Sequence, residues 1–209
     1  MTKVLLIGSS ALGGASVSKQ VAEALLEELR RAEPDLQLTT RDVGAEPLPH
    51  LEPARMPAFG GNTDTPEAAE TAALSQAVID EVFAADLIVI ASPMYNFGIT
   101  STLKAWFDHL LRAGITFRYT ATGSEGLVHG KRAIVVEARG GVYSDGGPSA
   151  GSDHQEPHLK TLLNFIGITD VSFVRAEGLA IGPEQKEQGI AAALTQAREV
   201  AQRFAPVAA

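Results

Sequence analysis

The chain has 209 residues, of which 45% are hydrophobic and 20% charged, and its formal net charge is -8 at pH 7. This length and composition predict one globular α/β domain over residues 1–209, without low-complexity blocks or internal repeats. Because the sequence has no cysteine, disulfides, thiol nucleophiles and cysteine-ligated metals are excluded, and the acidic balance argues against general binding to nucleic acid or anionic membranes.

The N-terminal residues carry no export signal. Met1-Thr2-Lys3 leads directly into the apolar run 4–7, without the basic segment, long apolar stretch and cleavage site of a signal peptide. Nowhere do 18 apolar residues follow one another. We therefore expect a cytoplasmic protein with no membrane partner.

The first expected elements are a buried strand at 4–7, a loop rich in serine and glycine, and an amphipathic helix over 18–31. Backbone N–H groups at a helix start, the helix dipole and the hydroxyls of Ser10, Ser16 and Ser18 are typical of an anion site, and a terminal phosphate suits it. The alternative is that Ser16 or Ser18 only caps the helix.

This loop matches neither of two well-known phosphate motifs. Gly8 and Gly13 have the spacing of a Walker A sequence, but Gly14 stands where its lysine should be. No G-x-G-x-x-G sequence occurs in the loop. Hydrolysis of nucleoside triphosphates is therefore not expected.

An alternating strand is expected at 36–42, and a helix over 67–84 leads to a fully apolar strand at 87–91. The intervening segment 43–66 is rich in proline and glycine and has neither helical nor strand periodicity. A loop this long inside a compact domain is usually functional, so we expect a lid or an interface arm. The alternative is a plain excursion of the chain.

The stretch Ser92-Pro93-Met94-Tyr95-Asn96-Phe97-Gly98 follows the strand at 87–91. Its three large apolar side chains stand where turn chemistry favours small polar ones. Ligands of parallel sheets bind beyond the carboxyl ends of the strands, so we expect this loop to lie against a flat ligand. The alternative is that these residues cover the end of the sheet as core.

A helix is expected over 99–111, followed by a long excursion at 114–126. Two aromatic residues of this excursion, Phe117 and Tyr119, have no obvious place in the sheet. A fourth strand is expected at 132–138 and leads into Arg139-Gly140-Gly141, where the glycines allow the backbone to approach a ligand closely. The alternative is that the glycines only form a turn.

The C-terminal part is expected to form a helix, a strand and a closing helix at 158–167, 170–176 and 183–204. Ahead of them, His154-Gln155-Glu156-Pro157-His158 invites a metal-site interpretation. It lacks the H-E-x-x-H order, and Pro157 prevents a regular helix through both histidines, so no metal is predicted. The other histidines have no partner visible in the sequence, so no acid-base role is assigned to them.

Strands and helices alternate five times along the chain. This predicts a five-stranded parallel sheet of order 2-1-3-4-5 with helices on both faces. The serine-rich loop, the aromatic loop and the glycine loop then meet at one edge. Such an arrangement suits a flat mononucleotide with its phosphate at the first helix.

At these motifs the sequence resembles the FMN-dependent NADH-azoreductases, the azoreductase type 1 group of flavodoxin-like quinone reductases. The resemblance runs in order over nearly the whole chain. The matching stretches are Ser9-Ser10, Ser16-x-Ser18, Ser92-Pro93-Met94-Tyr95-Asn96-Phe97, Thr116-Phe117-Arg118-Tyr119-Thr120, Gly126-Leu127, Arg139-Gly140-Gly141, Phe165-Ile166-Gly167-Ile168-Thr169-Asp170 and Ala176-Glu177-Gly178.

The resemblance implies a flavodoxin-like three-layer homodimer with one FMN per subunit at the dimer interface. It implies two-electron ping-pong reduction of quinones and aromatic azo compounds with NADH or NADPH as donor. The chemistry then lies on FMN, so no catalytic side chain is predicted. A flavodoxin-type electron carrier with protein partners and a flavin-free ligand-sensing module are the alternatives.

Carried over residue by residue, the family's contacts fall on three groups of positions. The phosphate contacts fall on Ser10, Ser16, Val17 and Ser18, the isoalloxazine contacts on Met94, Tyr95, Asn96 and Phe97, and the glycine-loop contacts on Ala138, Arg139, Gly140 and Gly141. The substrate-pocket candidates are Phe117, Tyr119 and Leu162. Ala138 replaces a frequent hydroxyl residue and Leu162 an aromatic of some members, so substrate preference does not carry over.

Overall fold

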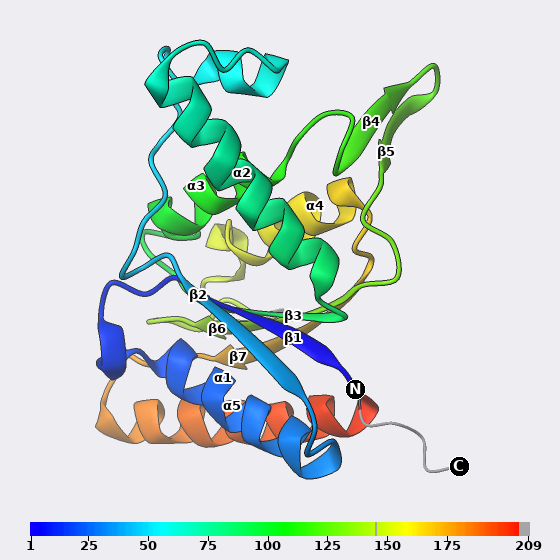
Figure 1. Cartoon of the computed structure of the whole chain (residues 1–209). Coiled ribbons are helices and arrows are strands. Elements are labelled where there is room, and N and C mark those ends of the chain that lie inside the picture. The colour runs from blue at the N-terminus through cyan, green and yellow to red at the C-terminus, as the bar shows by residue number, and fades with distance from the viewer. Residues whose placement is uncertain (145, 205–209) are drawn as a thin grey trace.

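A five-stranded parallel sheet forms the middle layer of the computed structural model, which describes residues 1–144 and 146–204 (Figure 1). The strands lie in the order β2-β1-β3-β6-β7, which is the predicted order 2-1-3-4-5 once the strands of this sheet are counted along the chain. Their bounds are β1 Lys3–Gly8, β2 Gln37–Asp42, β3 Leu87–Pro93, β6 Arg132–Ala138 and β7 Asp170–Ala176.

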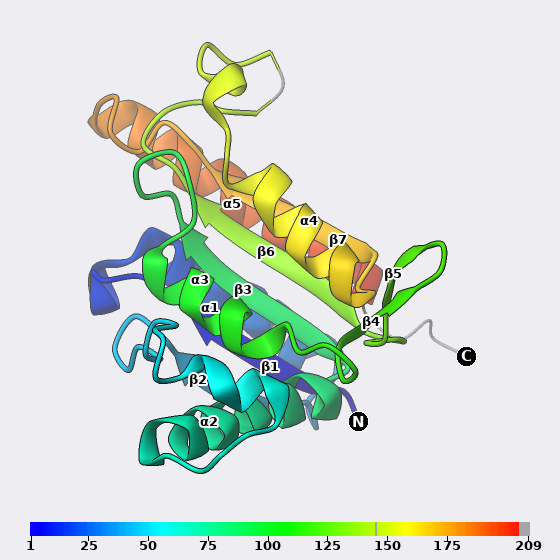
Figure 2. The same ribbon diagram turned by 90° about the horizontal axis from the view of Figure 1, so that it is seen from above.

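Helices cover both faces of this sheet, so the structure has three layers (Figures 1 and 2). One face carries α1 (Val17–Ala32) and α5 (Pro183–Phe204). The opposite face carries α2 (Pro66–Ala84), α3 (Ser101–Leu110) and α4 (Glu156–Ile166). In the described part of the chain, none of the helices has the length and apolar composition that a membrane crossing requires.

The central strands β1, β3 and β6 consist mostly of apolar residues because both of their faces are covered. Every residue of β3 is buried. Successive residues of β1 alternate between two cores: Leu5 and Ile7 pack in the cluster with α2, α3 and α4, whereas Val4 and Leu6 pack in the cluster with α1 and α5. The period of two along an extended strand therefore divides the interior into two cores.

Parallel pairing brings the carboxyl ends of the strands to one edge of the sheet. Gly8 at the end of β1 pairs with Ala91 of β3, and Pro93 at the end of β3 pairs with Ala138 of β6. Beyond this last pair, the Met94 N–H donates to the Ala138 carbonyl at 2.8 Å. The three predicted loops consequently leave the sheet next to one another.

The excursion at 114–126 contains a β-hairpin that the sequence did not predict. Its strands are β4 (Phe117–Thr120) and β5 (Gly123–Gly126), which pair antiparallel outside the main sheet. The strands are short and have few apolar residues, so they lack the alternation that predicts a strand. The hairpin is instead stabilised by paired polar groups, including Arg118 and Glu125 at 2.8 Å.

The long segment 43–66 contains the short 3-10 helix η2 (Met56–Gly60) and lies against the helices of the second face. Arg55 contacts Glu70 of α2 at 2.8 Å, and the His109 Nε2 of α3 lies 3.0 Å from the Pro49 carbonyl oxygen. Burial lowers the pKa of His109 and thus favours the neutral ring, whereas the contact with the Pro49 carbonyl oxygen, which only accepts a hydrogen bond, acts in the opposite direction.

Candidate functional site

The serine-rich loop ends in a capped helix start that also offers free donors. After the 3-10 turn η1 (Gly13–Ala15), Ser16 caps α1, with its Oγ accepting from the Lys19 N–H at 3.3 Å and lying 3.1 Å from the Ser18 Oγ. Within the described residues, the N–H groups of Val17 and Ser18 donate to no acceptor. Capping and anion binding are thus compatible here, because the cap uses one donor and leaves two.

The backbone under this loop requires a glycine. A Cβ built on Gly44 would lie 2.3 Å from the Ser10 carbonyl oxygen, far closer than carbon and oxygen approach without a bond. On the other side, the Ser9 hydroxyl donates to the Ala91 carbonyl at 2.9 Å. The loop is therefore held between β2 and β3 before any ligand binds.

The aromatic loop is a two-residue β-hairpin turn. Tyr95 and Gly98 exchange both backbone hydrogen bonds, at 3.0 and 3.1 Å, and the residues between them have positive φ angles of 48° for Asn96 and 73° for Phe97. This is the pattern of a type I′ turn. Asparagine tolerates it well, whereas phenylalanine in this region stores strain of the kind found at ligand sites.

The turn contains two backbone donors that are not used within the described part of the protein. Among residues 1–144 and 146–204, no acceptor receives a hydrogen bond from the N–H of Asn96 or Phe97. The turn also contacts the serine-rich loop, since the Tyr95 hydroxyl accepts from the Ala11 N–H at 3.2 Å. The first and second loops are therefore in direct contact.

In the glycine loop, backbone N–H groups are available to a ligand, whereas the Arg139 side chain is not. The Arg139 side chain is fully buried and pairs with Glu137 at 2.5 Å, with Asp153 at 3.1 Å and with Glu177 at 3.3 Å. Its guanidinium is consequently not available to a ligand. The N–H groups of Gly140 and Gly141 donate to no acceptor in the described part of the chain, so they are the candidate donors of this loop.

The ion network beneath this loop perturbs the ionisation of two carboxyl groups. Burial raises the pKa of Glu137 to about 8, and Glu156 adds to this effect while Arg139 opposes it. The Glu137 Oε1 is buried without a hydrogen-bond partner in the described structure, which disfavours the charged form. Burial of Glu156 is outweighed by its hydrogen bonds to Arg175 and Lys160, so its pKa falls to about 2.

One cavity of about 240 Å³ joins the three loops. It is lined by Ser10, Leu12, Ala15, Ser16, Val17, Pro93, Met94, Tyr95, Ala138, Arg139, Gly140, Leu179 and Lys186. Eight of these residues are predicted cofactor contacts, whereas Leu12, Ala15, Pro93, Leu179 and Lys186 were not predicted. Four predicted contacts are not among the lining residues: Ser18, Asn96, Phe97 and Gly141. Leu179 and Lys186 follow β7, and the sheet order places them beside the other loops.

A flavin mononucleotide fits the chemistry of this cavity. Hydroxyls and unpaired N–H groups at the start of α1 suit a phosphate, and the apolar walls at Met94 and Tyr95 suit a flat ring. Next to the lining residues Tyr95 and Gly140, the unpaired N–H groups of Asn96 and Gly141 suit the polar edge of such a ring. The observed donors therefore match the two ends of the ligand.

The three substrate-pocket candidates do not line this cavity within one chain. Phe117 is buried, 4.6 Å from the ring of Phe165, so its ring supports the hairpin. Tyr119 is 75% exposed on the hairpin, which lies at the opposite end of the sheet from the three loops (Figures 1 and 2). Leu162 is half-buried and packs on the core from α4.

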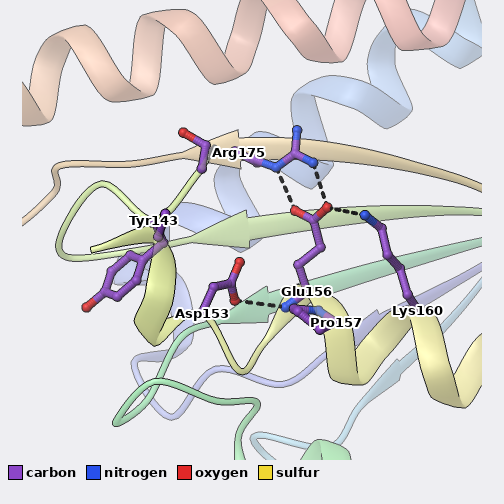
Figure 3. A pocket seen from close by; sticks show the side chains of 8 residues that line it. Tyr143, Asp153, Glu156, Pro157, Lys160 and Arg175 are labelled. Carbon is purple, nitrogen blue, oxygen red and sulfur yellow. Dashed lines mark hydrogen bonds and ion pairs between the residues drawn. The ribbon is translucent and has the colours of Figure 1, made fainter. Parts of the chain in front are cut away.

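A second cavity, of about 390 Å³, lies between α4, β7 and the segment after the glycine loop (Figure 3). Its charged side chains pair with one another: Glu156 accepts from Arg175 at 2.7 and 2.8 Å and lies 2.7 Å from the Lys160 Nζ. Within the described residues, no cluster of His, Asp or Glu could hold a metal. This pairing ties the start of α4 to β7.

The fold and the first cavity together define a flavodoxin-like mononucleotide-binding protein. The sequence matches the family described as having a flavodoxin-like fold over residues 2–201. An FMN-dependent NADH:quinone oxidoreductase of Hyphomonas neptunium (strain ATCC 15444) is 44% identical over 209 residues, covering 100% of both chains.

Two solved structures resemble the chain over nearly its whole length. The azoreductase of Bacillus anthracis str. Sterne is 32% identical, with a TM-score of 0.89 over 98% of this chain and 100% of that chain. An FMN-dependent NADH-azoreductase of Bacillus anthracis str. Ames Ancestor, solved in complex with FMN, is 28% identical, with a TM-score of 0.89 over 99% and 100%. The chain belongs to the family of FMN-dependent NADH:quinone oxidoreductases and azoreductases.

Proposed function

We propose that the chain is an FMN-dependent NAD(P)H:quinone oxidoreductase that also reduces aromatic azo compounds by two-electron, ping-pong transfer. The observation that carries this proposal is the cavity at which three loops meet, because its lining includes Val17 and Gly140, whose N–H groups donate to no acceptor within the described residues. Family membership over the full length supports the same activity. The whole chain acts as one cytoplasmic flavodoxin-like domain.

Three groups of residues around the cavity hold different parts of FMN. Ser10, Ser16, Val17 and Ser18 hold the phosphate; Met94, Tyr95, Asn96 and Phe97 hold the ring; and Ala138, Arg139, Gly140 and Gly141 border its polar edge. Arg139 contributes through its backbone, because its side chain is buried in the ion network. In this site FMN would supply the redox chemistry, a two-electron transfer from NADH or NADPH to the second substrate.

The chain itself contributes orientation and fixed donors, and no catalytic side chain is proposed. The backbone N–H groups of Asn96, Phe97 and Gly141 donate to no acceptor within the described residues, so they would be available to the negative charge that develops on the edge of a reduced ring. They act without reorganisation because the turn and the ion network fix their backbone. Met94 and Tyr95 line the cavity, so they would cover one face of a bound ring and would leave the other face for both substrates in turn.

We place the second wall of the substrate pocket on a partner subunit of a homodimer. Tyr119 is 75% exposed at the end of the sheet opposite the three loops, so it can reach such a cavity in a second chain but not in its own. Exposed tyrosines are common at interfaces because the ring buries much surface at little entropic cost. Phe117 supports this tyrosine from below, 5.5 Å away between ring centroids.

The electron-carrier alternative is not favoured. Relatives that match over the full length are named as oxidoreductases or azoreductases. A stable one-electron form of the bound flavin during reductive titration would instead support the electron-carrier function. Protein that takes up no FMN would instead favour the flavin-free module.

The test uses the purified full-length protein. Its visible spectrum should show bound flavin, and NADH or NADPH oxidation should depend on an added benzoquinone or azo dye. Initial rates measured at several concentrations of both substrates should give the parallel double-reciprocal lines of a ping-pong reaction. Intersecting lines would show that both substrates bind together, which contradicts the shared-face mechanism.

A further inference from the structure

The segment His154-Gln155, which the proposed mechanism does not use, contacts both the aromatic loop, here called the ring loop (92–98), and the glycine loop (139–141). Gln155 is fully buried immediately before α4. Its neighbour Glu156 is fixed to β7 by Arg175 (Figure 3). A buried amide is costly unless its polar atoms are paired, so its partners indicate what it does.

The Gln155 amide makes three hydrogen bonds, and they join two of the three loops. Its Oε1 accepts from the Arg139 Nε at 3.1 Å, at the start of the glycine loop. Its Nε2 donates to the carbonyl oxygen of Ser92 at 2.8 Å and lies 3.0 Å from the Ser92 Oγ, at the start of the ring loop. One side chain therefore spans the gap between both loops.

These partners allow a single orientation of the amide. Arginine can only donate and a carbonyl oxygen can only accept, so the position requires an acceptor on one side and a donor on the other. A carboxylate of the same shape would keep the contact with Arg139 and set a negative oxygen against the Ser92 carbonyl. An apolar side chain would remove the hydrogen bonds that Gln155 makes to the buried Arg139 Nε and to the Ser92 carbonyl oxygen.

The same segment contacts the strained turn directly. The His154 N–H donates to the Phe97 carbonyl oxygen at 3.0 Å, next to the residue with φ of 73°. Arg139 is further fixed by its carboxylate partners, of which Glu177 also accepts from the Tyr143 N–H at 2.8 Å. The separation of the ring loop from the glycine loop is thus set from behind, outside the cavity.

We propose that Gln155 is a positioning residue that fixes the N–H donors of the ring loop relative to those of the glycine loop. This inference rests on the proposed function, since these donors face the polar edge of FMN. Donors placed to match the reduced ring stabilise it more than the oxidised ring, because it carries more negative charge there. Gln155 therefore raises both the affinity for FMN and the midpoint potential of the bound flavin.

The experiment compares Gln155→Glu and Gln155→Met with matched variants at Gln202, which is exposed on α5. FMN affinity is measured by quenching of flavin fluorescence, the midpoint potential by equilibration with reference dyes, and folding by thermal unfolding. Both Gln155 variants should bind oxidised FMN about tenfold more weakly. They should bind reduced FMN a further tenfold more weakly, which makes the potential about 30 mV more negative.

A milder variant keeps the test independent of folding. Ser92→Ala removes one acceptor of the Gln155 amide and leaves the Ser92 carbonyl. Its smaller effect on affinity should disappear in the Gln155→Met background, because the shared contact is already lost there. Additive effects, or Gln155 variants that lose stability while affinity and potential stay unchanged, would overturn the proposal. Failure of the proposed function is distinguishable, since the unaltered protein would then bind no FMN.

Discussion

Glu137 is the residue whose charge the structure constrains most. It lies fully buried beside Arg139, with its Oε1 unpartnered in the described structure, and burial raises its pKa to about 8. In the unfolded chain the same carboxyl titrates near its ordinary value of 4.5. Between these two values the folded protein binds more protons than the unfolded chain, so stability falls as the pH rises.

We therefore predict that Glu137→Gln removes a pH-dependent loss of stability. The stabilising contribution of the neutral carboxyl is complete below pH 4.5 and is lost as the pH rises to about 8. From pH 5 to pH 8 the unaltered protein should lose at least about 1 kcal/mol relative to the variant, or about 2–4 °C in Tm. Thermal unfolding without added FMN at several pH values measures this difference.

The matched control for this prediction is Glu187→Gln, because Glu187 is exposed on α5. That variant should follow the unaltered protein at every pH. Parallel curves for Glu137→Gln and the unaltered protein would show that Glu137 keeps its charge in the fold.

At the scale of elements, the turn at Asn96 and Phe97 has the most unusual backbone conformation among the three loops of the site. Two consecutive non-glycine residues have positive φ, and their N–H groups donate to no acceptor within the described residues. The structure retains them although each costs stability in most contexts. Backbone conformation, more than side-chain chemistry, is therefore what this turn supplies to a ligand.

The prediction for the turn contrasts two substitutions of one residue. Asn96→Gly keeps the positive φ without strain, whereas Asn96→Val places a β-branched side chain in a conformation that it strongly disfavours. The glycine variant should retain FMN with an affinity within about threefold of the unaltered protein, and the valine variant should lose at least about tenfold. Fluorescence quenching measures both, and equal affinities would show that the turn conformation does not matter.

At the scale of the whole molecule, the separation of Tyr119 from the three loops is the basis of the homodimer that we propose. The hairpin projects at one end of the sheet and the cavity opens at the other (Figure 1). A two-fold dimer repeats one contact twice, so two complete pockets would form from two incomplete chains. Each pocket would then combine loops of one subunit with the partner's Tyr119.

Mixing two defective variants tests this arrangement. We expect Tyr119→Ala to raise KM for the quinone with FMN retained, and Asn96→Val to lose FMN. Refolding equal amounts together gives mixed dimers in which one pocket carries both lesions and the other carries neither. Activity at low quinone should recover to roughly a quarter of the unaltered level. No recovery, or a monomer by sedimentation, would contradict the dimeric pocket.

The sequence by itself determined the order of the main strands, the three loops at one edge and most residues lining the cavity. These features are local: apolar runs, serine and glycine clusters and one aromatic turn have recognisable patterns, and parallel strands place their loops together. Tertiary structure alone decided that Phe117 is buried, that Arg139 withholds its side chain, and that Gln155 joins two loops. Such contacts join residues far apart along the chain, and their partners are set by packing, which no local pattern records.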